Sequence, residues 1–211
     1  MIATPRLAAR YVGRPDDPRT TPRRASLVTC GERIGAIWIR SGIAHVITRD
    51  DRPVRMLSVH ERGSWVLPEV ALLGLPSPYE VIAHTGVEWH HWPVDRLSDE
   101  ARSGLARAAF AESLRRAELM AGSPHVPVAD RVLVALKYLA SQPSAMTHPD
   151  GMQIRVSRRL IAQMVGCSRE MVGRVLTNGE LSDVVQIPKR SGRAMVVLDP
   201  ERRLVRDQVA A

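Results

Sequence analysis

The stretch VGCSREMVGRVL, residues Val165–Leu176, places a Gly-Cys-Ser turn between two short segments that mix apolar and charged residues. The segment before it, RVSRRLIAQMVG, predicts a helix that begins after Ser157, and SREMVGRVL predicts a second helix that begins after Ser168. A serine hydroxyl at each start can accept the unpaired backbone N–H groups of a helix N-terminus. Gly166 suits a tight turn in which a side chain would be crowded. The spacing therefore predicts a helix–turn–helix.

The charged residues of the second helix have the chemistry of a base-reading surface. In a DNA-binding helix–turn–helix the second helix lies in the major groove, and its first turns reach the base edges. Arg169 and Arg174 can donate to guanine O6 and N7, and Glu170 can accept from a cytosine amine. Glu170 and Arg174 stand at i and i+4, so we expect the carboxylate also to hold the arginine in place. Ser168, at a helix N-terminus, can approach a phosphate.

The charge of the whole chain agrees with a nucleic-acid partner. Its formal charge is +8 with a pI near 10.6, which favours nucleic acid first and a membrane surface second, although arginine-rich composition alone would give the same surplus. Within residues 152–198, eight Lys/Arg oppose three Asp/Glu. No nucleophile–base or metal-ligand arrangement has an informative spacing, so we do not expect an enzyme.

The remaining composition points to a reducing compartment. Cys30 and Cys167 are too few for a disulfide framework or a four-cysteine metal site, and Cys167 is interpreted as a small turn residue. The first 20 residues contain no apolar stretch of signal-peptide length, and nothing approaches the roughly 20 apolar residues of a membrane span. We therefore expect a cytoplasmic protein.

Outside the helix–turn–helix, the chain divides into three further segments. Residues 1–24 are rich in arginine and proline and predict a flexible basic arm, which is more simply a solvated tail than a contact to DNA or a second subunit. Residues 25–95 contain short alternating segments separated by turn signals at Ser41-Gly42 and Arg62-Gly63, which predicts an antiparallel β domain. EVIAHTGVEWHHW supplies its last strands.

An alanine-rich helix is predicted from Leu97 to Ala121, within a linking segment of residues 96–126. A stripe spaced four, three and four residues apart runs along it, as in a coiled-coil seam. Two interpretations stay open, a homodimer seam and a face packed on the β domain. The members of the stripe are Phe110, Leu114, Ala117 and Ala121.

Residues 127–211 contain the helix–turn–helix and its neighbours. Val128–Ala140 predicts a helix with a periodic apolar face. AMTHPDGM predicts a polar, turn-rich loop, and VVQIPKRSGRAMVVLD predicts a β-hairpin with its turn at Ser191-Gly192. A basic hairpin in this place resembles the wing of a winged helix–turn–helix.

The segment Gln142–Leu176, with its motif GCSRE-x-VGR, resembles the C-terminal domain of the CRP/FNR family of transcription regulators, and within it the catabolite activator proteins. The resemblance implies a homodimer on double-stranded DNA with TGTGA-like palindromic sites. The residues that it implies for base reading are Arg169, Glu170 and Arg174, and those for the DNA backbone are Ser157, Arg158 and Ser168. Met171 stands where the family often has threonine.

The same resemblance covers the AMTHPDGM segment. Thr147, His148 and Gly151 occupy positions that, in catabolite activator proteins, contact RNA polymerase through the C-terminal domain of its α chain, which implies an activator. Without the resemblance, a Pro-Gly turn between two elements is the simpler interpretation.

The β domain resembles the family's cyclic-nucleotide-binding β-roll more loosely. Glu69 stands at the place of the ribose-binding glutamate, but Pro68 replaces a glycine and removes a backbone N–H. The Arg-Ser pair that neutralises the cyclic phosphate is missing, and an anion buried without its arginine lacks a compensating charge. We therefore interpret Glu69 as part of a degenerate pocket and do not expect cyclic AMP to bind in the usual mode.

Three alternatives remain for this β domain. It can bind another ligand in a pocket lined by some of its tryptophans, or it can be a ligand-independent dimerisation scaffold. Three histidines suggest a haem or metal site. Adjacent His90 and His91 point to opposite faces of a strand, however, so both cannot easily bind one metal ion. The tryptophans are Trp38, Trp65, Trp89 and Trp92, and the third histidine is His84.

Taken together, these observations predict an α+β protein with an N-terminal β-roll, a long dimerisation helix and a C-terminal winged helix–turn–helix. The predicted function is a sequence-specific transcription regulator without a cofactor. The alternative is a nucleic-acid-binding module, or a sensor of haem or another small ligand, without activator output.

Overall fold

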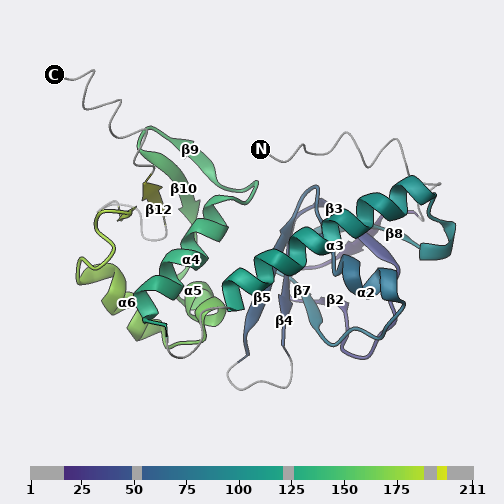
Figure 1. The fold of residues 1–211 in the computed structure, drawn as a ribbon, viewed down its shortest axis with the longest axis horizontal. Helices are drawn as coiled ribbons and strands as arrows, with labels where there is room; N and C mark the ends of the chain where they lie inside the picture. The colour runs from purple at the N-terminus through teal and green to yellow at the C-terminus, as the bar shows by residue number, and fades with distance from the viewer. Residues whose placement is uncertain (1–16, 49–53, 121–125, 188–193, 199–211) are drawn as a thin grey trace. The chain divides into compact units, whose positions relative to one another are not determined.

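The computed structural model describes residues 17–48, 54–120, 126–187 and 194–198. The chain divides into two compact units, residues 1–117 (the N-terminal unit) and 118–211 (the C-terminal unit). Each unit contains both helix and sheet, as the α+β prediction requires (Figure 1). Among the helices described, none combines the length and apolar character needed to cross a membrane.

Two four-stranded antiparallel sheets form the β-roll of the N-terminal unit. One has the order β1-β8-β3-β6 and the other β2-β7-β4-β5. Neighbouring strands in both sheets pair antiparallel, which confirms the predicted sheet type. The strands are β1 (Arg19–Thr21), β2 (Ser26–Val28), β3 (Ala36–Ser41), β4 (Ile43–Ile47), β5 (Met56–Glu61), β6 (Trp65–Val66), β7 (Glu80–Ala83) and β8 (Val87–Trp92).

Glycines make the tight turns of this roll. Gly42, between β3 and β4, has φ +90°, and a Cβ there would lie 2.1 Å from the carbonyl oxygen of Gly86. Gly63, between β5 and β6, has φ +87°. Both positions are left-handed, a conformation in which a side chain is strained, so the two turn signals in the sequence mark real chain reversals.

The space between the two sheets is filled by aliphatic side chains that alternate along the strands. Residues of β3, β4 and β7 point inward in turn, with Ile37, Ile39, Val46 and Val81 almost completely buried. Trp89 of β8 joins this core, and its indole N–H donates to the Thr21 hydroxyl at 2.9 Å. Alternation with one buried face is the pattern expected for packed antiparallel sheets.

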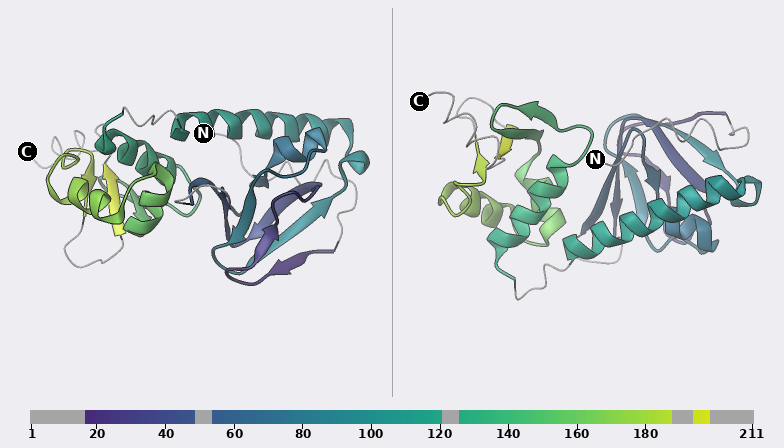
Figure 2. Two further views of the ribbon diagram at one scale, coloured as in Figure 1. Left: turned by 90° about the horizontal axis from the view of Figure 1, so that it is seen from below. Right: turned by 45° about the horizontal axis from the view of Figure 1, so that its top comes forward.

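Two helices cover the N-terminal unit. The short helix α2 (Pro68–Leu73) and the long helix α3 (Asp99–Met120) both lie against the β-roll (Figure 2). The first half of α3 packs its small and aliphatic side chains on a second cluster that includes three tryptophans. The members of this cluster are Ala36, Trp38, Trp65, Leu72, Trp92, Val94, Leu97, Ala101 and Leu105.

The C-terminal unit packs three helices against a four-stranded antiparallel sheet of order β11-β12-β10-β9. Leu136 and Ile161 are completely buried where the helices meet. The helices are α4 (Val128–Ala140), α5 (Arg158–Val165) and α6 (Arg169–Thr177), and the strands are β9 (Met146–His148), β10 (Gly151–Arg155), β11 (Val185–Gln186) and β12 (Ala194–Leu198). The predicted starts of all three helices are confirmed.

Two segments differ from the sequence prediction. The AMTHPDGM segment is not a loop, because Met146–His148 pairs with Gly151–Gln153 in a hairpin, so the loop prediction was wrong. Backbone hydrogen bonds to β10 outweigh the polar, turn-rich composition. Arg19–Thr21, inside the segment predicted as an arm, forms β1, whose Arg19 guanidinium lies 5.3 Å from the centre of the Trp89 ring. The strand β12 pairs with β11 as predicted, while Ser191-Gly192 lies outside the described residues.

Candidate nucleic-acid interface

Both helices of the helix–turn–helix begin on a serine cap. The Ser157 hydroxyl accepts from the Leu160 N–H at 3.2 Å, and the Ser168 hydroxyl accepts from the Met171 N–H at 3.1 Å. Between them, Gly166 ends α5 in a left-handed conformation with φ +67°. The two serines predicted to face the DNA backbone therefore also fix the helix starts, and their exposed hydroxyls can still donate to a phosphate oxygen.

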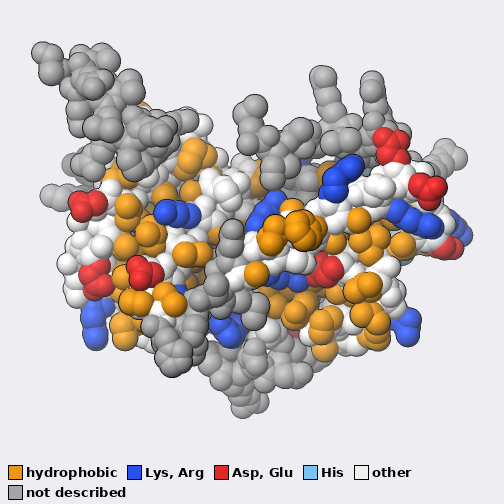
Figure 3. All heavy atoms as spheres, viewed as in Figure 1, with side chains coloured by type: hydrophobic (Ala, Val, Ile, Leu, Met, Phe, Trp, Pro, Cys, Tyr) orange, Lys and Arg blue, Asp and Glu red, His pale blue; other side chains and the backbone are white. Residues whose placement is uncertain are grey.

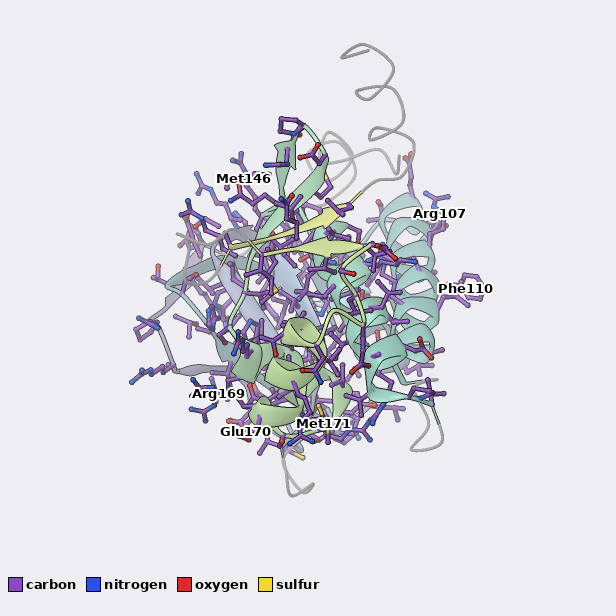
Figure 4. All side chains as sticks on the ribbon, turned by 90° about the vertical axis from the view of Figure 1, so that its left-hand side faces the viewer. Arg107, Phe110, Met146, Arg169, Glu170 and Met171 are labelled. Carbon is purple, nitrogen blue, oxygen red and sulfur yellow. The ribbon has the colours of Figure 1, made fainter. Side chains whose placement is uncertain are left out.

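The recognition helix α6 has one buried and one exposed face. Val172, Gly173 and Val175 are buried, whereas the predicted base-reading residues Arg169, Glu170 and Arg174 are exposed. Figure 4 shows Arg169, Glu170 and Met171 side by side at the start of α6, pointing away from the C-terminal unit. The structure thus brings the three predicted base-reading side chains onto one solvent-facing surface.

The expected brace between Glu170 and Arg174 is not formed. No ion pair joins them in the part of the chain that the structure describes, and both side chains are exposed. An exposed i,i+4 pair gains little in water, because solvent screens the attraction and holding two long side chains costs entropy. Both groups are therefore left free for base contacts.

A close approach between α5 and α6 holds Arg158, the third predicted backbone contact. The Arg158 side chain crosses α6 at Gly173, where an added Cβ would lie 3.2 Å from Nη1 of Arg158. Gly173 therefore leaves space for the guanidinium beside the recognition helix. The sequence alone did not identify this role, because a glycine inside a helix shows only lowered helix propensity.

Arg131 of α4 is a functional neighbour that the sequence alone did not identify. Its Nη1 donates to the Val165 carbonyl at 2.6 Å, across 34 residues of sequence, where α5 ends. A cation at a helix C-terminus is favourable for the helix dipole. Burial raises the pKa of the Cys167 thiol and the charge of Arg131 opposes that rise, so Arg131 also faces the turn. Its hydrogen bond therefore joins α4 to the end of α5, directly before the turn that leads to α6.

We expect Arg131→Met to weaken specific DNA binding by about tenfold, since a hydrogen bond from a charged group is worth about 1.5–3 kcal/mol and its loss frees the turn. Fluorescence anisotropy with a TGTGA palindrome measures the effect. Lys137→Met is the matched control, because Lys137 lies exposed on the same helix and its loss removes the same charge. If both variants lost the same DNA affinity, the effect would come from the removed charge alone.

The three residues implied for polymerase contact lie on the β9–β10 hairpin. Thr147 is exposed, and His148 is half-buried with its Nδ1 accepting from the Asp150 N–H at 3.2 Å. Gly151 is buried and has φ +156°, so of the three residues Thr147 is the most accessible to a partner. Met146, at the start of the same hairpin, is 43% exposed and is labelled in Figure 4.

The residues discussed for ligand binding in the N-terminal unit separate into different places. Trp38, Trp65 and Trp92 form a contiguous aromatic group with ring centres 4.9 and 5.6 Å apart, whereas Trp89 belongs to the core between the sheets. The His91 Nε2 accepts from the Gly35 N–H at 3.2 Å. Among the described residues, no group of three or more His, Cys, Asp or Glu side chains could hold a metal ion.

Comparison with known proteins places this interface in a family. The profile described as "Bacterial regulatory proteins, crp family" matches residues 154–178, which include both helices of the helix–turn–helix. The cAMP-activated global transcriptional regulator Vfr of Pseudomonas aeruginosa is 47% identical over 89 residues, which are 42% of this chain and 40% of Vfr. The corresponding regulator CRP of Escherichia coli is 30% identical over 165 residues, 74% of this chain and 78% of CRP.

Solved structures extend the likeness to both units. A transcriptional regulator of the CRP family from Thermus thermophilus has a TM-score of 0.69 at 20% identity, over 92% of this chain and 97% of that chain. The c-di-GMP responsive global regulator CLP of Xanthomonas campestris has a TM-score of 0.63 at 26% identity, over 86% of this chain and 93% of that chain. The chain therefore belongs to the CRP/FNR family of DNA-binding transcription regulators.

Proposed function

We propose that the protein is a homodimer that binds TGTGA-like palindromic DNA in the cytoplasm and regulates transcription there. The observation that supports this most directly is the exposed Arg169–Glu170–Arg174 edge on a serine-capped α6. Two arginine forks and one carboxylate on one helix face match guanine and cytosine edges in the major groove. Arg158 and the two capping serines flank this edge with groups for phosphate.

The exposed face of α3 supports the homodimer. Phe110 is the only phenylalanine of the chain, yet it is 68% exposed, and Leu114 one turn later is 51% exposed. Hydrophobic side chains gather on this face of the helix in Figure 3. The exposure of Phe110, Leu114 and Ala117 favours the dimer seam over packing on the β domain. Ala121 lies outside the described residues. A second copy of α3 would cover the stripe symmetrically.

A two-fold symmetric dimer predicts the geometry of its DNA site. Two recognition helices would meet two half-sites about one helical turn, roughly 34–36 Å, apart. The exposed Thr147 and Met146 on the β9–β10 hairpin leave a surface for RNA polymerase, through the C-terminal domain of its α chain, which supports an activator.

The effector is the part of the function in which we expect this chain to differ from its relatives. Vfr and CRP are cAMP-activated by name, and CLP is c-di-GMP responsive by name. Here Pro68 removes a backbone N–H beside Glu69, and the Glu69 carboxylate lies 2.6 Å from Nη1 of Arg116. We propose regulation that does not use cyclic AMP in the usual mode.

Arg174→Ala tests the proposed function. We expect a loss of about 1–3 kcal/mol of specific binding and relaxed choice at one guanine, because one bidentate base contact is removed. Anisotropy titrations with a TGTGA palindrome, single-base variants of it and scrambled DNA measure both effects. Arg155→Ala, which removes an exposed arginine from β10, is the control and should leave the base preference intact.

Equal binding of wild type and Arg174→Ala to the palindrome and to scrambled DNA would refute sequence-specific recognition. A steep salt dependence with no sequence preference would instead favour a general nucleic-acid-binding module. Native mass spectrometry with an absorption spectrum of the purified protein would show the oligomeric state, any retained ligand and any haem.

A further inference from the structure

Met171 is an exposed hydrophobic residue on the helix–turn–helix. Its side chain is 36% exposed, and no other hydrophobic side chain is exposed in α5 and α6, all of whose residues the structure describes. A single exposed hydrophobic residue is common on protein surfaces and has no meaning by itself. The position of Met171 among polar and charged neighbours gives it one. The other exposed residues of the two helices are Arg158, Arg159, Arg169, Glu170, Arg174 and Thr177.

Met171 lies in the first turn of α6, between residues that we propose to read bases. Glu170 directly precedes it, and Arg174 follows three residues later, so the side chains of Met171 and Arg174 are neighbours on the helix surface. The next residue, Val172, is completely buried. Figure 4 shows Met171 beside Arg169 and Glu170, pointing away from the C-terminal unit. DNA that is bound by Glu170 and Arg174 must therefore also meet Met171.

The chemistry of Met171 limits what it can contact on DNA. Its side chain has no N–H or O–H group to donate to a phosphate or a base, and its sulfur is at most a weak acceptor. Its backbone N–H is already used, because it donates to the Ser168 hydroxyl at 3.1 Å. The contact that remains is apolar. In the major groove, the apolar group that distinguishes one base pair from the others is the C5-methyl group of thymine.

The spacing along α6 places such a methyl group within reach. Residues three apart on a helix have Cβ atoms about 5–6 Å apart, and successive base pairs are about 3.4 Å apart along the DNA axis. Met171 therefore reaches one or two base pairs beyond the guanine that Arg174 binds. In TGTGA, both guanines have A·T pairs on either side. A thymine methyl group consequently lies beside whichever guanine Arg174 binds.

We propose that Met171 is a base-reading residue that contacts the C5-methyl group of a thymine next to the guanine bound by Arg174. The inference rests on the proposed function and deepens it, since it adds an apolar contact to the polar contacts of Glu170 and Arg174. An unbranched side chain with three rotatable bonds can adjust to the methyl group without movement of the helix. Met171 then selects an A·T pair, while its charged neighbours select G·C pairs.

Deoxyuridine tests the proposal, because it lacks the C5-methyl group of thymine and keeps all of its hydrogen-bonding groups. Anisotropy titrations compare the TGTGA palindrome with three others, in which the thymine of the first, third or fifth base pair of both half-sites is replaced by deoxyuridine. We expect the wild-type affinity to fall about tenfold at one of these positions, since burial of a methyl group contributes about threefold per half-site. Unchanged affinity at all three positions would overturn the proposal.

Variants of Met171 assign this loss to its side chain. Met171→Gln keeps the length of the side chain but ends it in an amide, so we expect thymine and deoxyuridine palindromes to bind within about twofold of each other. Met171→Leu keeps an apolar side chain and should retain most of the tenfold difference. Met146→Gln is the matched control, because Met146 is also an exposed methionine of the C-terminal unit and lies far from Met171 in Figure 4. It should keep the wild-type difference.

Loss of the thymine preference can be distinguished from loss of sequence-specific binding. A variant that only disturbed α6 would weaken binding to both palindromes and leave the ratio of the two affinities unchanged. If the wild type prefers the palindrome to scrambled DNA but Met171→Gln keeps the tenfold ratio, another residue reads the methyl group and this inference alone fails. If the wild type binds scrambled DNA as tightly as the palindrome, the proposed function fails, and this inference fails with it.

Discussion

Phe110→Asp is expected to convert the dimer into monomers. The substitution places a carboxylate in the middle of the exposed stripe on α3, where Figure 4 shows the Phe110 side chain projecting from the helix. In a two-fold interface each substitution occurs twice. Replacing a central aromatic residue costs about 2 kcal/mol or more of association free energy per copy. We therefore expect the dimer dissociation constant to rise by about 1000-fold. Sedimentation equilibrium measures this change directly.

The affinity for palindromic DNA should fall when the dimer is lost. A monomer presents one recognition helix, so we expect Phe110→Asp to bind a full palindrome no better than an isolated half-site. Leu73→Asp is the matched control, because Leu73 on α2 is also a 68% exposed hydrophobic side chain of the N-terminal unit. It should leave both oligomeric state and DNA affinity unchanged. A dimer that survives Phe110→Asp would show that α3 is not the interface.

The N-terminal unit is expected to lose stability steeply below about pH 6.5, the ordinary pKa of histidine. Burial lowers the pKa of His45 to about 3, with further lowering by His84 and His60. Burial also lowers the pKa of His60 and, together with Arg23, that of His84. His45 and His84 stack with ring centres 4.4 Å apart, so protonating one opposes protonating the other.

The fall of stability at low pH follows from proton linkage. Between pH 6.5 and 3 the unfolded chain binds a proton at His45 and the folded unit does not, so the free energy of unfolding falls as the pH falls. The stabilisation is complete above the unfolded pKa, and His45 alone contributes about 2 kcal/mol of loss between pH 7 and 5. Urea unfolding followed by tryptophan fluorescence at both pH values measures the difference.

His45→Gln removes a titrating group and should reduce this pH dependence by about 2 kcal/mol. His148→Gln, in the C-terminal unit, leaves in place the three β-roll histidines whose pKa is lowered and should keep the wild-type pH dependence of the fluorescence transition. If the free energy of unfolding of His45→Gln changed with pH as in the wild type, His45 would be protonated as readily in the folded unit as in the unfolded chain.

The helix–turn–helix could be predicted from the sequence because its determinants are local. Ser157 and Ser168 cap the helices that they precede, Gly166 takes the left-handed turn, and apolar spacing fixes the buried faces. Each of these effects acts within a few residues, so a short stretch of sequence contains all of the information. The same local spacing placed Arg169, Glu170 and Arg174 on one exposed face.

The face that α3 buries could not be predicted in this way. The sequence left open whether Phe110 and Leu114 meet a second copy or the β domain, and it gave no sign that Glu112 and Arg116 are buried. In the protomer the charged pair is buried and the hydrophobic pair is exposed. The reason lies in partners distant in sequence: Glu69 and His60 pair with the charged residues. Arg131 likewise meets Val165 only in the folded C-terminal unit.

The sequence by itself thus determined the two helices of the helix–turn–helix, their serine caps and the exposed face of α6, because hydrogen bonds and periodicity within one segment specify them. The tertiary structure decided which side chains of α3 are buried in ion pairs with α2 and the sheet and which hydrophobic side chains of the helix stay exposed. Those choices depend on the desolvation of charged groups and on the partners that the β-roll supplies, and neither quantity is a property of a single segment.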